Sequence, residues 1–571
     1  MTTLVARPIR PTRNIDQRHA LVATQHMRLM VLMLLFVAGV LAIIARLALL
    51  GVLSGGEDAL SNRLTAPRGD IVDRNGQPLA RTIDAWTIAV HPRKLIGDPT
   101  EIAQRLADLM PDRGNQAWFY QQITKPSSFA YLNRRASPAL VEAVNAIGEP
   151  GIVFERETQR LYPQSSLAAH VLGFISNGTG MSGIERALND RLTNPATEAK
   201  PVQLAIDSRA QAAMESELGR AMTTFSARGG GGVVLDVATG EVIAMVSLPT
   251  FNPNRVGRAG LDELRNVTTQ SVFELGSTFK PITMATAIDN GVVTSMQRRF
   301  DATHPLQVGR FTIHDERGDP KRWLNMAETL IYSSNVATAR VADEVGPARM
   351  QAMFKKLGFD TPPDIELREK GRPLLPSYWA RTTTMTTAYG HGIAVTPLHL
   401  ASAYAALVNG GTWRPATLLK VAPGHQVAGR RVISEQTSAR MRQMLRLVVL
   451  RGTGRKGDAP GYRVGGKTGT AEAAVAGGYD RSRNVATFAA AFPMDAPRYV
   501  VVAMLDSPLG TKETYGWKTA AWNAAPVVGR TIARIGAMLG VTPDDRRDVD
   551  VSDILPTLWQ DPSRAPTSGG Q

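Results

Sequence analysis

The sequence predicts a membrane-anchored protein of the α+β class with more than one folded domain. A single uncharged apolar stretch covers residues 29–45, which is the composition of a helix that crosses a bilayer. The chain has 571 residues, more than one hydrophobic core usually serves. Apolar runs at 229–236 and 238–247 predict two strands of a buried sheet, and the pattern at 526–539 predicts a helix.

The composition limits the classes of function. Lys and Arg number 65 against 50 Asp and Glu, a net charge of +15, which suits a membrane surface or an acidic polymer. The charge is spread along the chain without a zinc finger or other nucleic-acid signature, so we expect no nucleic-acid partner. The absence of cysteine excludes disulfides and cysteine metal sites and leaves the redox compartment open. We expect neither a metal nor a cofactor.

The apolar run resumes after Arg46 and reaches position 53, and Arg46 can extend its side chain to the membrane surface. We therefore assign residues 29–53 to a transmembrane anchor. The leader, residues 1–28, holds five arginines and one acid, which predicts a cytoplasmic N-terminus with the rest of the chain outside. A cleaved signal peptide and a buried core helix are the alternatives, but no clear small-x-small cleavage site follows the run.

Residues 60–225 mix short strand and helix patterns and carry no catalytic motif that we recognise. Asn75-Gly76 favours the positive φ angles of a tight hairpin turn. We expect four charged residues of this segment to form ion pairs that hold its packing, without chemistry: Arg68, Asp73, Arg74 and Glu185. The glycine run that follows at 229–232 lacks the Gly-Lys-Ser/Thr ending of a phosphate loop, so we interpret it as a flexible entry to the first strand of the buried sheet.

Ser277 and Lys280 stand at Ser-x-x-Lys spacing, between Gly276 and Pro281. Pro281 cannot lie deep inside a helix, so it predicts a helix start close to Ser277. Residues three apart share a helix face, so the Lys280 amine can reach the Ser277 hydroxyl and activate it. Alone, this spacing is common by chance, with the serine as a helix cap and the lysine in solvent.

Two more motifs follow in order: Ser333-Ser334-Asn335 and Lys467-Thr468-Gly469-Thr470. With all three, the chain resembles the penicillin-binding proteins and serine β-lactamases, which carry Ser-x-x-Lys, Ser-x-Asn and Lys-Thr-Gly. The resemblance implies a serine β-lactamase-like transpeptidase domain, here residues 226–541, with a central antiparallel sheet flanked by helices. It also makes 60–225 an elongated α/β pedestal of the dimerisation type. We expect the charged, proline-containing tail at 542–571 to be disordered.

The resemblance also implies roles in the site. Ser277 is the expected nucleophile, Lys280 its base and Ser333 a proton relay, while Lys467 attracts a substrate carboxylate and depresses the pKa of Lys280. The backbone N–H groups of Ser277 and Thr470 form the oxyanion hole by the same resemblance. The expected substrate-binding residues are Asn335, Thr468, Gly469 and Thr470.

Class B penicillin-binding proteins include a septal division transpeptidase and an elongation transpeptidase. The second motif and Gly390-His391-Gly392 resemble those of the division type more than those of the elongation type. The resemblance therefore implies a D,D-transpeptidase that cross-links peptidoglycan stems through a serine acyl-enzyme and binds β-lactams. Its expected place is the inner membrane with a periplasmic catalytic domain, beside a septal membrane glycosyltransferase and other division proteins. An elongation-type enzyme, a β-lactam sensor or β-lactamase, and an inactive scaffold are the alternatives. We expect His391 to lie in a structural loop near the cleft, with catalysis as the less favoured role.

Overall fold

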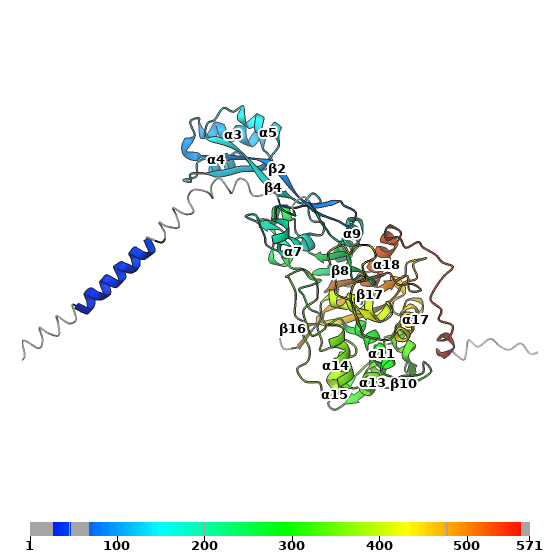
Figure 1. The fold of residues 1–571 in the computed structure, drawn as a ribbon. Helices are drawn as coiled ribbons and strands as arrows, with labels where there is room; N and C mark the ends of the chain where they lie inside the picture. Colours follow the sequence, from blue (N-terminus) through cyan, green and yellow to red (C-terminus); the bar gives the residue numbers. More distant parts are fainter. Residues whose placement is uncertain are drawn as a thin grey trace, which may run out of the picture. The chain divides into compact units, whose positions relative to one another are not determined.

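The computed structural model describes residues 27–44, 46, 68–197, 200–316, 318–475 and 478–560 (Figure 1). The chain divides into two units, residues 1–66 and 67–571. In the first unit, the helix Met27–Ile44 is 18 residues long and apolar enough to cross a membrane. Residues 1–26 of the predicted leader, and residues 45 and 47–53 of the predicted anchor, lie outside the described residues.

The second unit begins with the predicted hairpin. Strands β1 (Ile71–Val72) and β2 (Pro78–Val90) pair antiparallel, and Gly76 in their turn has a φ of 84°. Strand β2 also pairs with both β3 (Ala130–Ala136) and β4 (Ile152–Leu161). The helices that share a buried core with these strands are α3 (Pro99–Leu109), α4 (Gln116–Ile123) and α5 (Pro138–Asn145) (Figure 1).

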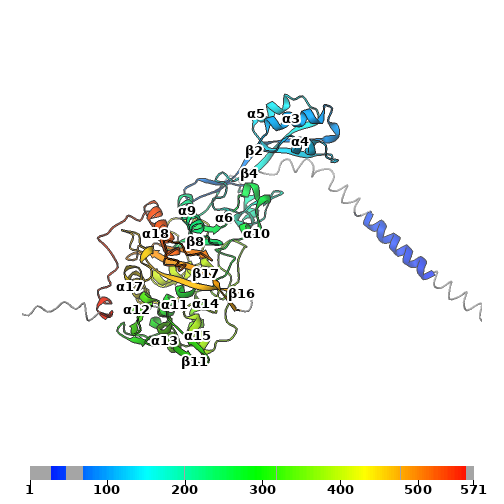
Figure 2. The ribbon, with the colours of Figure 1, turned by 180° about the vertical axis from the view of Figure 1, so that it is seen from behind.

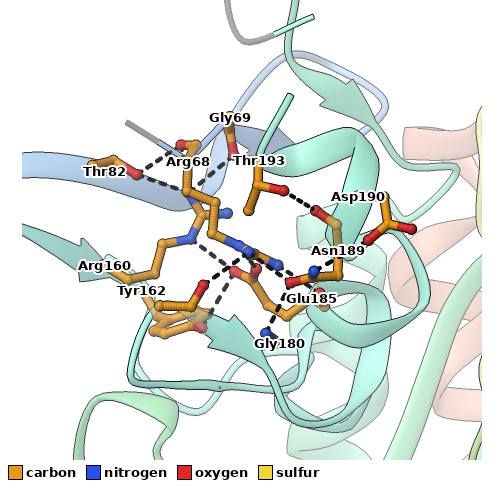
Figure 3. A network of polar contacts seen from close by, with 11 residues as sticks. Arg68, Gly69, Thr82, Arg160, Tyr162, Gly180, Glu185, Asn189, Asp190 and Thr193 are labelled. Atoms are coloured by element: carbon orange, nitrogen blue, oxygen red, sulfur yellow. Dashed lines mark hydrogen bonds and ion pairs between the residues drawn. The ribbon is translucent and has the colours of Figure 1, made fainter. Parts of the chain in front are cut away.

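Two arginines, Arg68 and Arg160, meet one glutamate, Glu185 (Figure 3). The Nε atom of Arg160 donates to Glu185 Oε1 over 2.7 Å, Arg68 pairs with the other carboxylate oxygen, and Tyr162 donates its hydroxyl to Oε1. The Glu185 side chain is fully buried. The predicted packing role of Arg68 and Glu185 is therefore confirmed, because the network joins the start of the unit to α7 (Gly183–Ala187) and to β4.

Of the other two charged residues that were expected to form ion pairs, Arg74 forms one, whereas Asp73 makes hydrogen bonds instead in the described part of the chain. Asp73 accepts hydrogen bonds from the backbone N–H groups of Asn75 and Gln77 and from the Ser208 hydroxyl. Arg74 lies 3.9 Å from Glu241. The contact of Arg74 with Glu241 ties the hairpin to the part of the chain predicted as the transpeptidase domain. The other short elements of this region are α6 (Ala169–Leu172), β5 (Ile175–Ser176), β6 (Thr179–Gly180), α8 (Asn189–Leu192) and β7 (Val202–Gln203).

The part of the chain predicted as the transpeptidase domain is built on a five-stranded antiparallel sheet in the order β16-β17-β18-β8-β9. The strand pattern of the sequence is confirmed, since every apolar run that predicted a strand forms one. The strands are β8 (Gly229–Asp236), β9 (Val242–Leu248), β16 (Gly465–Val475), β17 (Gly478–Phe492) and β18 (Tyr499–Asp506).

The sheet separates two hydrophobic cores. Successive side chains of a strand point to opposite faces, and accordingly Val233 belongs to one core and Val234 to the other. Helices α9 (Ser208–Thr224) and α18 (Ala524–Ile535) cover one face. The other face carries the helices that hold the site, as both views of the ribbon show (Figures 1 and 2). They are α11 (Lys280–Asp289), α12 (Met326–Tyr332), α13 (Asn335–Val345), α14 (Pro347–Lys356), α15 (Arg381–Thr387), α16 (Pro397–Val408) and α17 (Glu435–Arg451).

Short elements complete this domain. Strand pairs β10 (Arg299–Asp301) with β13 (Trp323–Asn325), and β11 (Leu306–Val308) with β12 (Phe311–Ile313), lie in the sequence between α11 and α12. The remaining elements are helix α10 (Leu261–Leu264) and the strands β14 (Thr412–Trp413) and β15 (Arg430–Arg431).

The tail differs from the prediction. Residues 542–560 are described, and they pack on the domain of the five-stranded sheet rather than being disordered. Ile554 is fully buried, Asp548 pairs with Arg446 over 2.8 Å, and Asp553 pairs with Arg440. The charges that suggested disorder are matched by arginines of α17, which the tail sequence alone does not reveal. Residues 561–571 of the predicted tail lie outside the described part.

Candidate active site

Ser277 lies where the sequence predicts, in a 3₁₀ turn (Gly276–Phe279) that continues directly into α11. Pro281 occupies the first turn of that helix, where its missing N–H leaves no bond unmade. Gly276 has a φ of 55°, and a Cβ there would stand 2.9 Å from the backbone oxygen of Thr470. A glycine at 276 thus lets the third motif approach the turn of the nucleophile.

Ser333 ends α12 in the left-handed conformation, with φ 62° and ψ 35°. This conformation is unfavourable for most residues other than glycine. The next residues explain how it is held. The Ser334 hydroxyl donates to Asp315 over 2.7 Å, and the backbone N–H of Val336 donates to the other oxygen of the same carboxylate over 2.9 Å. Asp315 therefore clamps the second motif. Sequence reasoning missed this residue, because nothing in the spacing of the motifs points to it.

The Ser333 hydroxyl lies between two lysines. Its oxygen is 3.1 Å from Lys280 Nζ and 2.9 Å from Lys467 Nζ. Lys280 also donates to the backbone oxygen of Ser333, and Lys467 donates to the backbone oxygen of Thr468 over 3.0 Å. Both lysine side chains are fully buried. The structure therefore brings the second and third motifs together on one hydroxyl group.

The expected contact between Lys280 and Ser277 is replaced. Among the hydrogen bonds of the described residues, the Lys280 amine bonds to Ser333 and not to Ser277. A protonated lysine amine carries three donors, and Ser333 accepts two of them. Ser277 remains three residues away on the same turn, and its side chain is partly exposed. The pair thus retains the predicted spacing without the direct bond.

Burial sets the protonation of both lysines. It lowers the pKa of Lys280 from its usual 10.5 to about 7, against the opposing charges of Asp315, Asp319 and Glu316. Burial, followed by the charge of Lys280, lowers the pKa of Lys467 well below its usual value. Burial, rather than the charge of Lys467, is thus the first cause of the lowered pKa of Lys280. The reason is that burial removes water from an ammonium group, which destabilises its charged form.

Strand β16 brings the predicted substrate-binding residues to the turn. A Cβ on Gly469 would lie 2.2 Å from the backbone oxygen of Leu275, so any other residue would push the strand away. The Thr468 hydroxyl donates to Thr453 over 2.7 Å, and the Thr470 hydroxyl accepts from the N–H of Ala520 over 3.1 Å. The Asn335 amide donates to the backbone oxygen of His314. All four predicted residues thus line one region around Ser333 and the Ser277 turn.

The loop of His391 packs on the same turn. A Cβ on Gly390 would lie 2.2 Å from the backbone oxygen of Gly276, and the N–H of His391 donates to Thr386. Burial, and then the charge of Lys280, lower the pKa of His391 to about 4, so its imidazole is neutral near pH 7. Within the described ranges, no group of three or more His, Cys, Asp or Glu residues could hold a metal.

Comparisons with known proteins agree on a family. The penicillin-binding protein transpeptidase domain matches residues 230–528, and the penicillin-binding protein dimerisation domain matches residues 63–195. The probable peptidoglycan D,D-transpeptidase FtsI of Caulobacter vibrioides is 41% identical over 489 residues, which are 83% of this chain and 82% of that protein. FtsI of Escherichia coli is 28% identical over 515 residues, which are 84% of this chain and 85% of that protein.

Solved structures give the same result. Penicillin-binding protein 3 of Mycobacterium tuberculosis in complex with aztreonam superposes with a TM-score of 0.66 at 28% identity, over 84% of this chain and 98% of that one. The ampicillin complex of the same protein also gives a TM-score of 0.66, over 85% and 99%. The match to both domain families and the identity to full-length relatives leave one assignment. The chain belongs to the penicillin-binding proteins, in the class whose transpeptidase domain follows a dimerisation domain.

Proposed function

We propose that the chain cross-links septal peptidoglycan as a serine D,D-transpeptidase. The observation that carries the proposal is the hydroxyl of Ser333 between two buried lysines, next to the turn of Ser277. This arrangement joins a nucleophile, a base and a proton relay in one site. The relatives named peptidoglycan D,D-transpeptidase, FtsI among them, support both the reaction and its place in division.

In the first step, neutral Lys280 accepts the Ser277 proton as the serine oxygen attacks the carbonyl carbon of the penultimate D-Ala of a donor stem. Only a neutral amine can accept a proton as a general base. Because the pKa of Lys280 is about 7, about half of the Lys280 amines are neutral near pH 7. The N–H groups of Ser277 and Thr470 hold the oxyanion, a contribution of about 3–4 kcal/mol per donor. The terminal D-Ala leaves as an amine after Ser333 passes it the proton from Lys280.

In the second step, an amine of another stem attacks the ester carbonyl, an amide bond forms, and the bond to the serine oxygen breaks. A β-lactam imitates the first step, and its ester with Ser277 persists. Lys467 and the hydroxyls of Thr468 and Thr470 bind the carboxylate of the donor or of the β-lactam, and Asn335 binds a peptide carbonyl. The aztreonam and ampicillin complexes of the similar Mycobacterium tuberculosis protein support this use of the site.

The helix Met27–Ile44 anchors the enzyme in the inner membrane. The arginines of the leader keep the N-terminus in the cytoplasm, so the catalytic domain works in the periplasm, where the stems are. Its partners are a septal membrane glycosyltransferase, which makes the glycan strands that carry the stems, and other division proteins. FtsI relatives support this membership.

Labelling of membranes with a fluorescent penicillin tests the proposal. The wild type should form a covalent adduct that persists for many minutes, and Ser277→Ala should form none. Ser216→Ala, which alters an exposed serine of α9, is the matched control and should label like the wild type. Rapid release of the label would indicate a β-lactamase instead, and labelling of Ser277→Ala would refute the assignment of the nucleophile.

A further inference from the structure

A second polar cluster lies behind the nucleophile turn and has no part in the first step. Glu274, three residues before Ser277, accepts hydrogen bonds on one oxygen from the N–H of Gly392 and the hydroxyl of Tyr479, each over 3.0 Å. Glu274 is only 9% exposed. The other carboxylate oxygen, Oε2, is buried and finds no hydrogen-bond partner among the described residues.

The ring of His391 forms the neighbouring wall of this cluster. Its centroid lies 5.3 Å from the ring of Tyr389 and 6.3 Å from that of Tyr479. In the described part of the chain, its ring nitrogens form no hydrogen bond, and its loop is fixed by the close approach of Gly390 to Gly276. The charge of Lys280 acts on His391, which sets the imidazole beside the catalytic site.

A buried carboxylate oxygen without a partner is costly, because the group has lost water and gained nothing in return. A cation with N–H donors would satisfy it. His391 is neutral near pH 7, so within the described cluster it adds no charge that would repel such a cation. Tyr479, whose hydroxyl donates to the other oxygen of this carboxylate, is 45% exposed.

We propose that Glu274, His391 and Tyr479 form the subsite that binds the amine of the acceptor stem in the second step. The ligand is a primary ammonium group, held by Glu274 and hydrogen-bonded to the imidazole of His391. This proposal rests on the proposed function, since an acceptor is needed only if an acyl-enzyme forms on Ser277. It assigns the specificity for amine over water to residues outside the three motifs.

Bonds and protons balance in the attack of the acceptor amine on the acyl-enzyme. The acceptor arrives as R–NH₃⁺ and releases one proton to solvent after binding beside Glu274. The nitrogen lone pair then attacks the ester carbonyl, so a C–N bond forms and the bond from carbon to the Ser277 oxygen breaks. The second proton leaves the nitrogen and returns to the serine oxygen through Lys280. The products are the amide cross-link and the free serine, with no oxidation or reduction.

The competing explanation is that Glu274 only holds the loop of Gly392. The two explanations separate in Glu274→Gln, because the amide oxygen still accepts from Gly392 and Tyr479 while the negative charge is lost. The matched control is Glu215→Gln on α9, another partly buried carboxyl with two hydrogen bonds, to Ala168 and Gln211. His391→Phe is the second variant, since it keeps a ring of similar size without nitrogens.

The full-length protein in detergent is given an acyl-D-alanyl thioester as donor and the tripeptide L-Ala-γ-D-Glu-L-Lys as acceptor. Mass spectrometry then measures the ratio of amide product to hydrolysed product. Both products come from the same acyl-enzyme, so the ratio does not depend on the rate of acylation. We expect the ratio to fall at least tenfold in Glu274→Gln and at least threefold in His391→Phe, and to stay at the wild-type value in Glu215→Gln.

An unchanged ratio in both Glu274→Gln and His391→Phe overturns the subsite, as does an equal fall in Glu215→Gln. If Glu274→Gln does not fold, the ratio in His391→Phe decides. A wild type that hydrolyses the thioester and forms no amide also overturns the subsite, while the acyl-enzyme itself stands. A Ser277→Ala variant that still consumes the thioester refutes the proposed function instead, so the two failures are distinct.

Discussion

Asp315→Asn tests whether the clamp on the second motif controls acylation. The aspartate accepts one bond from the Ser334 hydroxyl and one from the N–H of Val336. Asparagine keeps one acceptor oxygen, so one charge-assisted bond is lost, which costs about 1.5–3 kcal/mol. Ser333 is then free to leave its left-handed conformation, which is unfavourable by about 1–2 kcal/mol. At about 1.4 kcal/mol per tenfold in rate, we expect acylation to slow by roughly 10- to 100-fold.

The same change predicts a shift in pH dependence. The charge of Asp315 is the first of those that raise the pKa of Lys280 against burial, so its removal lowers that pKa below about 7. Acylation requires neutral Lys280 and therefore rises as the pH increases through this pKa. In Asp315→Asn, we expect the rise to move to lower pH while the plateau is reduced. A purely structural loosening would lower the plateau without this acid shift.

The assay is the second-order rate of labelling by a fluorescent penicillin between about pH 5 and pH 9, the range in which the pKa of Lys280 places the transition. Glu316→Gln is the control, because Glu316 also raises the pKa of Lys280 without holding Ser334 or Val336. It should shift the transition slightly and leave the plateau intact. A normal plateau in Asp315→Asn, or a transition at higher pH, would refute the reasoning.

Three further changes test other parts of the structure. Gly469→Ala places a Cβ 2.2 Å from the backbone oxygen of Leu275, so β16 must move, and we expect penicillin labelling to fall at least tenfold with a stability loss of about 1–3 kcal/mol. Gly257→Ala, where a Cβ would meet nothing within 4 Å, should label normally. Glu185→Gln leaves the guanidinium groups of Arg68 and Arg160 buried without their counter-charge, which should cost about 3–5 kcal/mol. An unchanged melting temperature would contradict the importance of this network. Ile554→Ala removes a fully buried side chain of the tail and should lower the free energy of unfolding in urea by about 2–5 kcal/mol. No effect would mean that the tail is dispensable, as its composition suggested.

Local rules explain what the sequence could predict. The helix start near Ser277 follows from Pro281 alone, and the strands follow from apolar runs and turn residues, so both were confirmed. The prediction of a disordered tail was wrong because the acids of the tail were considered without their partners. These partners are arginines of α17 about a hundred positions earlier, at 440 and 446. The Asp315 clamp and the free oxygen of Glu274 depend likewise on partners that only the folded chain brings together.

The charges of Lys280 and Lys467 also depend on surroundings that only the folded chain provides. The motifs name Lys280 and Lys467 but do not say which is charged. In the structure, one hydroxyl oxygen lies within 3.1 Å of both amines, and two ammonium groups this close repel each other in a dry interior. Burial lowers the pKa of both lysines, while Asp315, Asp319 and Glu316 keep the pKa of Lys280 near 7 rather than lower. The base strength of Lys280 thus depends on burial and on a loop of acids that no motif contains, and a homologue that loses these acids should retain the three motifs and acylate with an altered pH dependence.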